Sequence, residues 1–115
     1  MAKAPRTVLA AYFEAWKAKD FDAYQALLAD DVTFDGPLGQ AAGAKECRLG
    51  LEAMSEVVTD IVVEHVFVDG PDVLTWFQLH TSVAPPCATA NWSHVEDGKI
   101  THIRAIFDPR PLVHP

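Results

Sequence analysis

Residues 91–111 read NWSHVEDGKITHIRAIFDPRP and predict a hairpin of two long strands. The turn falls at Asp97-Gly98, because Asp-Gly between apolar runs is the strongest short-range hairpin signal and glycine takes a positive φ without steric cost. Pro109 stops the second strand, since proline has no N–H for a sheet ladder. Alternation gives that strand two faces, with Ile100, His102, Arg104 and Ile106 on one and Thr101, Ile103, Ala105 and Phe107 on the other. The second face is nearly free of charge, so we expect it to lie across the rest of the chain.

The composition is that of an ordinary globular protein. Of 115 residues, 50% are hydrophobic and 22% are charged, which suits one domain over residues 1–115. The net charge of −7, without any cluster of Lys and Arg, argues against a nucleic-acid partner. No apolar run reaches the roughly 18–20 residues that span a bilayer. Two distant cysteines without CxxC spacing suit a reducing compartment, so we expect a cytoplasmic protein with no membrane partner.

The first half of the chain has helical periodicity. A first helix begins near Pro5 with Thr7 as its cap. A second helix is capped by Asp20 and ends at Asp30-Asp31, and a third covers residues 44–57. Their apolar stripes are Leu9, Tyr12, Phe13 and Trp16, then Phe21, Tyr24, Leu27 and Leu28, then Cys47, Leu51, Met54 and Val58.

The second half has the alternation typical of strands. After a short strand at residues 32–35 and a turn at 36–39, strands are predicted at residues 61–68, 73–83, 87–95 and 100–107. Helices followed by antiparallel strands indicate an α+β fold. The simplest packing is a curved sheet wrapped around the helices, which leaves a cone with a cavity at its open end.

Three phrases of the sequence carry a resemblance: residues 19–32 (KDFD to LADDV), 35–39 (DGPLG) and 97–108 (DGKI to IFD). The chain resembles the nuclear-transport-factor-2-like superfamily, in its SnoaL-like polyketide cyclase and ketosteroid isomerase branch, over almost its whole length. The resemblance implies a cone of three N-terminal helices packed in a curved, mostly antiparallel sheet. Isomerases, cyclases, epoxide hydrolases, dehydratases and binding modules share this fold, so it does not define a reaction.

The carboxylates that the resemblance would make catalytic are missing. Isomerases of this branch carry an Asp just before the proline of the turn, where this chain has Gly36. Cyclases and limonene-type epoxide hydrolases carry an Asp on the inner face of the last strand, which corresponds to Ala105. Asp35 and Asp108 lie nearby with the opposite strand parity. Each is interpreted either as a displaced proton carrier or as a hydrogen bonder at a turn or strand end.

Tyr12 and Asn91 correspond by position to the oxyanion hole of the isomerases. That site uses a Tyr on the first helix and an Asp on the third long strand, and an Asn amide can also donate to a developing oxyanion. Both residues have a structural interpretation as well. Tyr12 would then be a core tyrosine with its hydroxyl at the rim, and Asn91 a buried amide with internal partners.

We expect the cone to hold a hydrophobic small molecule. The predicted substrate-binding residues are Trp16, Phe34, Leu51, Met54, Phe77, Ile103, Ala105 and Phe107. No cofactor and no metal are implied, because the sequence has no HxxxH pair, GxGxxG or P-loop. His94 and His102 have two interpretations: a functional pair that faces across the hairpin, or two partly exposed histidines on the convex face of the sheet.

Two functional hypotheses stay open. In the first, the protein is a cyclase- or isomerase-like enzyme that polarises a hydrophobic carbonyl compound with Tyr12 and Asn91, and Asp35 or Asp108 carries the proton. In the second, it is a non-catalytic ligand-binding or assembly module that has lost the carboxylates.

The chain has more large aromatic side chains than one small core can bury. Trp76, Trp92 and Ile106 are assigned to the outer face of the sheet by strand parity, together with His80. Exposed aromatics at such density mark an interface, so we expect a homodimer through the sheet face.

Overall fold

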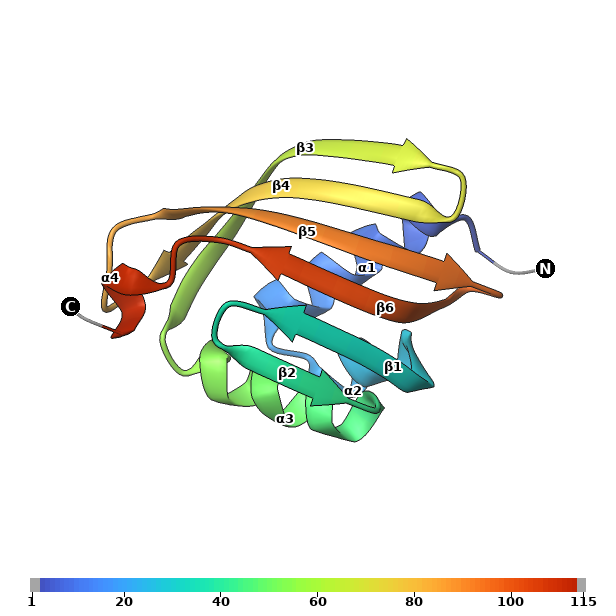
Figure 1. Cartoon of the computed structure of the whole chain (residues 1–115), viewed down its shortest axis with the longest axis horizontal. Helices are drawn as coiled ribbons and strands as arrows, with labels where there is room; N and C mark the ends of the chain where they lie inside the picture. Colours follow the sequence, from blue (N-terminus) through green and yellow to red (C-terminus); the bar gives the residue numbers. More distant parts are fainter. Residues whose placement is uncertain (1–2, 114–115) are drawn as a thin grey trace.

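The computed structural model describes residues 3–113 and has the predicted α+β architecture, with helices first and strands afterwards (Figure 1). The elements are α1 (Pro5–Ala18), α2 (Phe21–Ala26), β1 (Leu28–Gly36), β2 (Gly39–Ala42), α3 (Ala44–Ser55), β3 (Val58–Asp69), β4 (Asp72–Thr81), β5 (Cys87–Glu96), β6 (Lys99–Ile106) and α4 (Arg110–Val113). Within the described residues, no helix is long and apolar enough to cross a membrane.

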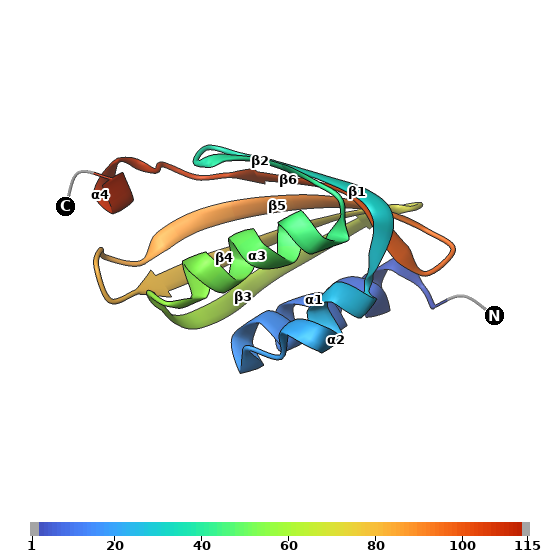
Figure 2. The ribbon, with the colours of Figure 1, turned by 90° about the horizontal axis from the view of Figure 1, so that it is seen from below.

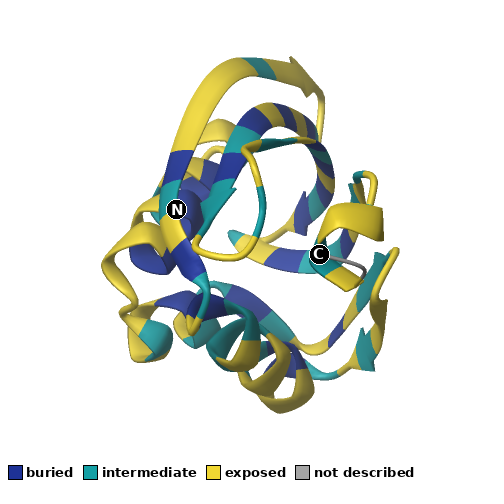
Figure 3. Cartoon of the chain, turned by 90° about the vertical axis from the view of Figure 1, so that its left-hand side faces the viewer, coloured by how far each residue is buried: buried dark blue, intermediate teal, exposed yellow. Residues whose placement is uncertain are grey.

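All six strands belong to one sheet, in the order β2-β1-β6-β5-β4-β3. β1 and β6 run parallel, and the other neighbouring pairs are antiparallel. The sheet is curved, and α1, α2 and α3 all lie on one side of it (Figure 2). Figure 3 shows buried positions on the surfaces of the sheet and the helices that face each other. This arrangement confirms the prediction of three helices packed in a curved, mostly antiparallel sheet.

α1 supplies much of the core. Its buried residues are Val8, Leu9, Tyr12, Phe13, Ala15 and Trp16. The rings of Phe13 and Trp16 meet Phe77 of β4 edge-on, with centroids 5.1 and 5.8 Å apart. Burying an aromatic or aliphatic side chain of this size stabilises a fold by about 1.5–3 kcal/mol. The helix is therefore held against the inner face of the central strands.

The first two helices begin in different ways. α1 has Ala4 as its N-cap and Pro5 in its first turn, so the prediction that Thr7 caps this helix is wrong. Proline favours the first helical position because the N–H that it lacks would have no helical partner there. Asp20 does cap α2, since its carboxylate accepts from the backbone N–H of Ala23 at 3.1 Å.

α2 ends at Ala26, several residues before the predicted end at Asp30-Asp31. Leu28 instead begins β1 and is the strand partner of Ile100. Pairing with a distant strand overrides the local helical periodicity, because weak propensities yield to tertiary packing. β2 has no counterpart among the predicted strands, and it folds back on β1 as a hairpin closed by the Gly36–Gly39 pair.

The β5–β6 hairpin turns at Asp97-Gly98, both with positive φ (51° and 76°), as its sequence predicts. His94 and His102 are directly paired across the hairpin, and both are half-buried. The next pair is Val95 with Ile100, which leaves Thr101 as an extra residue in β6. This irregularity turns Ile100 into the core, and its predicted place on the polar face is wrong.

Candidate ligand-binding site

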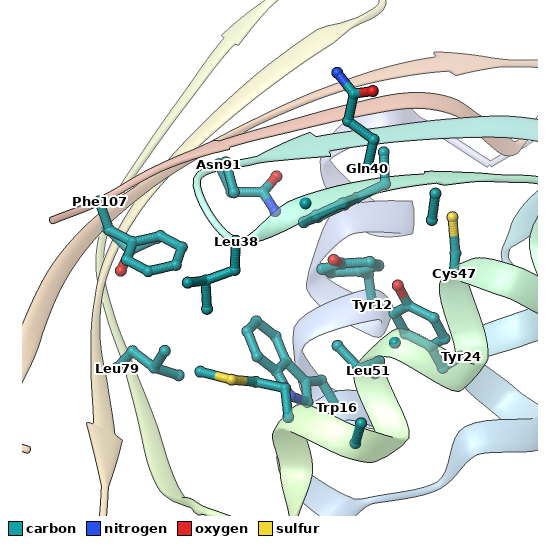
Figure 4. A pocket seen from close by; sticks show the side chains of 18 of the residues that line it. Tyr12, Trp16, Tyr24, Leu38, Gln40, Cys47, Leu51, Leu79, Asn91 and Phe107 are labelled. Carbon is teal, nitrogen blue, oxygen red and sulfur yellow. The ribbon is translucent and has the colours of Figure 1, made fainter. Parts of the chain in front are cut away.

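A cavity of about 500 Å3 lies between α1, α3 and the inner face of the sheet (Figure 4). Its lining is mostly apolar. The residues around it are Tyr12, Trp16, Tyr24, Phe34, Leu38, Gly39, Gln40, Ala41, Cys47, Gly50, Leu51, Ala53, Met54, Phe77, Leu79, Thr89, Asn91, Ala105 and Phe107. Its size is in the range of pockets that enclose drug-sized ligands.

Tyr12, Tyr24 and Asn91 form the polar corner of this cavity. α1 provides Tyr12, α2 provides Tyr24 and β5 provides Asn91, and all three are buried. The rings of the two tyrosines have centroids 5.0 Å apart. Figure 4 shows the polar atoms of this corner across the cavity from Leu79 and Phe107.

Burial dominates the acid–base properties of the polar corner. It raises the pKa of Tyr12 to about 12, although side-chain hydrogen bonding with Tyr24 and Asn91 partly opposes the shift. The pKa of Tyr24 is also well above its ordinary value, first because of burial. Burial likewise raises the pKa of the Cys47 thiol to about 11. All three groups are therefore neutral around pH 7.

The other polar side chains of the lining have hydrogen-bond partners or bury their polar atom away from the cavity. Gln40 turns its amide away from the cavity and donates to Asp35 at 2.8 Å (Figure 4). The Thr89 hydroxyl donates to the backbone carbonyl of Cys87 at 3.1 Å. Trp16 has its indole N–H buried without a partner among the described residues.

The structure places seven of the eight predicted substrate-binding residues in the lining: Trp16, Phe34, Leu51, Met54, Phe77, Ala105 and Phe107. Ile103 is the exception. It is fully buried and pairs with Ser93, one inward position closer to the hairpin turn than the Asn91–Ala105 pair. Core side chains fill the fold at that level, so Ile103 packs in the core instead of facing a ligand.

The two predicted proton carriers lie outside the cavity. Asp35 points to the outer face of the sheet, where bonds with Gln40 and then Arg104 hold the pKa of its carboxylate below the usual value. Asp108 is bound by Arg110, which lowers the pKa of Asp108 to about 2. Asp35 faces outward because it alternates with the inward-facing Phe34 along β1. Asp108 lies outside the cavity because β6 ends two residues before it, at Ile106.

The positions where a carboxylate is missing do face the interior. A Cβ on Gly36 would come within 3.0 Å of the Phe34 ring, which lines the cavity. Ala105 lines the cavity directly and is the strand neighbour of Asn91. Among the described residues that line the cavity there is no Asp, Glu, His, Lys or Arg.

Sequence reasoning missed two polar parts of the site. Helical periodicity places Tyr24 in the apolar stripe of the second helix, whereas its approach to Tyr12 depends on how α1 and α2 pack. Thr89, Asn91 and Ser93 alternate on the inner face of β5, and all three are buried. That pattern of polar residues on the inward side of a central strand was readable in the sequence.

A family model for the SnoaL-like domain matches residues 9–103. The chain belongs to the SnoaL-like domain family. The match covers most of the chain, including most of α1, all of α2 and α3, and nearly all of the sheet. No protein of curated function matches the sequence of this SnoaL-like chain.

Solved structures resemble this SnoaL-like chain closely in fold. An NTF2-like protein of unknown function from Cytophaga hutchinsonii is 27% identical, with a TM-score of 0.89, over 99% of this chain and 98% of that one. An LEH-like epoxide hydrolase from M. tuberculosis is 24% identical, with a TM-score of 0.80, over 95% and 86% of the two chains. A de novo designed protein with a curved β-sheet is 21% identical, with a TM-score of 0.83, over 92% and 86%. The last two similarities concern the fold alone.

The outer face of the sheet in this SnoaL-like protein carries exposed aromatics beside histidines. Trp76, Trp92 and Ile106 are 39%, 37% and 64% exposed. Asp72 accepts hydrogen bonds from Trp92 at 2.9 Å and from His94 at 2.8 Å, and this contact raises the pKa of His94. No three His, Cys, Asp or Glu side chains of the described chain are grouped so that they could hold a metal ion.

Proposed function

We propose that this SnoaL-like protein binds a neutral, largely apolar carbonyl compound in its cavity, with the carbonyl oxygen at Tyr12 and Asn91. The observation that carries the proposal is the absence of any charged side chain among the described lining residues, combined with one polar corner. The apolar lining favours burial of an apolar ligand, and the polar corner can donate a hydrogen bond to a single acceptor on that ligand.

The charge state of the lining supports a neutral ligand. A buried carboxylate or ammonium needs a partner of opposite charge, and the described lining offers none. A carbonyl oxygen needs only a donor, which a phenol or an amide supplies. Charged ligands are therefore disfavoured, and carbonyl compounds are favoured.

Polarisation of the carbonyl is the chemistry that this lining supports. A general base near neutral pH would have to be a carboxylate or an imidazole of suitable pKa. Asp35 and Asp108 are held by Arg104 and Arg110 outside the lining. The binding-module hypothesis is thus favoured over acid–base catalysis, and the polar corner would bind and polarise its ligand without moving a proton between side chains.

Three tricyclic compounds of one shape test the proposal. 9-Fluorenone has a carbonyl acceptor, carbazole has an N–H donor at the same position, and fluorene has neither. Fluorescence titration should give tighter binding of fluorenone than of fluorene by about tenfold, because a buried hydrogen bond is worth roughly 1–3 kcal/mol. Asn91→Leu should remove most of this preference and leave fluorene affinity unchanged. Equal affinities of wild type and Asn91→Leu for fluorenone would assign Asn91 to the scaffold.

A further inference from the structure

We infer that Ser93 is a positioning residue that sets the direction of the hydrogen bonds in the polar corner, so that the cavity selects ligands that accept a hydrogen bond. The inference rests on the proposed function, because it concerns the same cavity. It assigns a role to a side chain that does not line the cavity.

Ser93 is a polar residue in an apolar environment. It is 0% exposed on the inner face of β5, and its strand partners Val73 and Ile103 are also 0% exposed. Its hydroxyl donates to the amide oxygen of Asn91 at 2.7 Å. A buried hydroxyl is costly without a partner, so this bond accounts for the Ser93 proton.

The bond from Ser93 decides which end of the Asn91 amide faces the ligand. Because the amide is planar, holding Oδ1 on the Ser93 side turns Nδ2 to the other side. Figure 4 shows the amide nitrogen of Asn91 turned into the cavity. With the amide reversed, Ser93 would accept from Nδ2, and its strand partners Val73 and Ile103 have no side-chain acceptor for its own proton.

The tyrosines add hydroxyl groups to the corner beside Asn91. Tyr12 and Tyr24 both line the cavity, and their ring centroids are 5.0 Å apart. Burial keeps both phenols neutral around pH 7, so each has one proton to donate. Together with the Asn91 amide nitrogen that Ser93 turns inward, these hydroxyl groups present donors to the cavity.

The expected selectivity follows from this polarity. A ketone oxygen meets the Asn91 amide donor, whereas the N–H of carbazole at the same place meets a second donor. An unpaired donor and an unpaired ligand N–H are both penalised in a dry site. The unmodified protein should therefore prefer fluorenone to carbazole by about tenfold or more.

Substitutions at Ser93 test the role without touching the lining. Ser93→Ala removes the hydroxyl, and Ser93→Cys keeps nearly the same volume with only a weak donor. Both should reduce the ratio of fluorenone to carbazole affinity by about tenfold, because the Asn91 amide is then free to turn. The affinity for fluorene reports on the shape of the cavity, and it should not change. Ser93→Thr retains a hydroxyl and should restore the ratio.

The carbonyl stretching frequency of bound fluorenone gives a second measurement. Hydrogen bonding lowers this frequency in the unmodified protein, and Ser93→Ala and Ser93→Cys should move it back toward the value in an apolar solvent. If the unmodified protein prefers fluorenone to fluorene but both variants keep the original selectivity and frequency, the role of Ser93 is refuted and the proposed function stands. If the unmodified protein has no preference for fluorenone over fluorene, the proposed function and the inference fall together.

Discussion

At the scale of single residues, burial decides the chemistry of Tyr12. Its pKa is raised from 10.0 to about 12, so the native state keeps this proton at a pH where the unfolded chain loses it. The stabilising contribution is complete below pH 10 and is lost as the pH rises toward 12. We expect the free energy of unfolding to fall by about 3 kcal/mol over this interval because of Tyr12, from a shift of roughly two pKa units.

Urea denaturation at pH 9 and pH 11 measures this effect. Tyr12→Phe should show a smaller fall between the two pH values than the unmodified protein, because phenylalanine has no proton to lose. An unchanged fall in Tyr12→Phe would mean that a different group, such as Tyr24, accounts for the alkaline transition.

Ala105 is the position at which a carboxylate can be restored with least disturbance. It lines the cavity beside Asn91, whereas an Asp at Gly36 would push the Phe34 ring, 3.0 Å from the new Cβ. A positioned general acid or base contributes about 10²–10⁴ in rate. The unmodified protein should therefore isomerise a Δ5-3-ketosteroid and hydrolyse a simple epoxide near the background rates.

Ala105→Asp should raise one of these rates by about 10- to 100-fold, part of the contribution of a positioned acid or base. Absorbance of the conjugated enone and chromatography of the diol are suitable measurements, and Gly36→Asp is the comparison variant. Rapid turnover by the unmodified protein would contradict the placement of Asp35 and Asp108 outside the reaction site.

At the scale of elements, the short helix α2 matters because it carries Tyr24 to the polar corner. The helix has six residues, fewer than an isolated helix needs, so its cap and its packing must hold it. Asp20 accepts from Ala23 N–H at its start, and Arg48 of α3 donates to Asp22 at 2.6 Å and to Gln25 at 3.1 Å. The Asp20 cap therefore holds the start of α2, and the Arg48 hydrogen bonds hold the helix against α3.

Asp20→Ala should lower the free energy of unfolding by about 1 kcal/mol, the usual cost of losing an N-cap. Thr7→Ala is a matched control, because Thr7 is exposed inside α1 and caps nothing. Chemical denaturation should show a loss for Asp20→Ala and no loss for Thr7→Ala. Similar losses in both variants would contradict the assignment of the cap.

At the scale of the whole molecule, we propose that the outer face of the sheet pairs with a second copy around a two-fold axis. Leu74, Trp76, Trp92 and Ile106 are exposed on three adjacent strands. Arg104 and Asp35 lie on the same face, so a two-fold arrangement can place opposite charges across the interface. A self-complementary patch of this kind favours an isologous dimer.

Light scattering at tens of micromolar should then return twice the chain mass of 12.6 kDa. Ile106→Glu should shift the protein toward the monomer, because a charge would be buried without a partner. Leu49→Glu places the same change on the exposed surface of α3 and should leave the dimer intact. A monomeric mass for the unmodified protein would refute this interface.

Local patterns in the sequence determined much of this protein. The Asp97-Gly98 turn, the Asp20 cap and the inward position of Ala105 all follow from turn chemistry, capping and the period of two in a strand. Such features depend on residues a few positions apart, so the sequence displays them directly. The fold class follows because helical and strand-like periods occupy different halves of the chain.

Only the tertiary structure decided which inward residues face a ligand. Ile103 and Ala105 share one face of β6, yet only Ala105 lines the cavity. Ile100 turns inward through an extra residue in the β5–β6 pairing, and Tyr24 reaches Tyr12 through the packing of α2 on α1. These outcomes depend on contacts between segments far apart in the sequence. Local periodicity gives the face on which a side chain lies, whereas the packing of distant elements decides whether that face meets the core or a cavity.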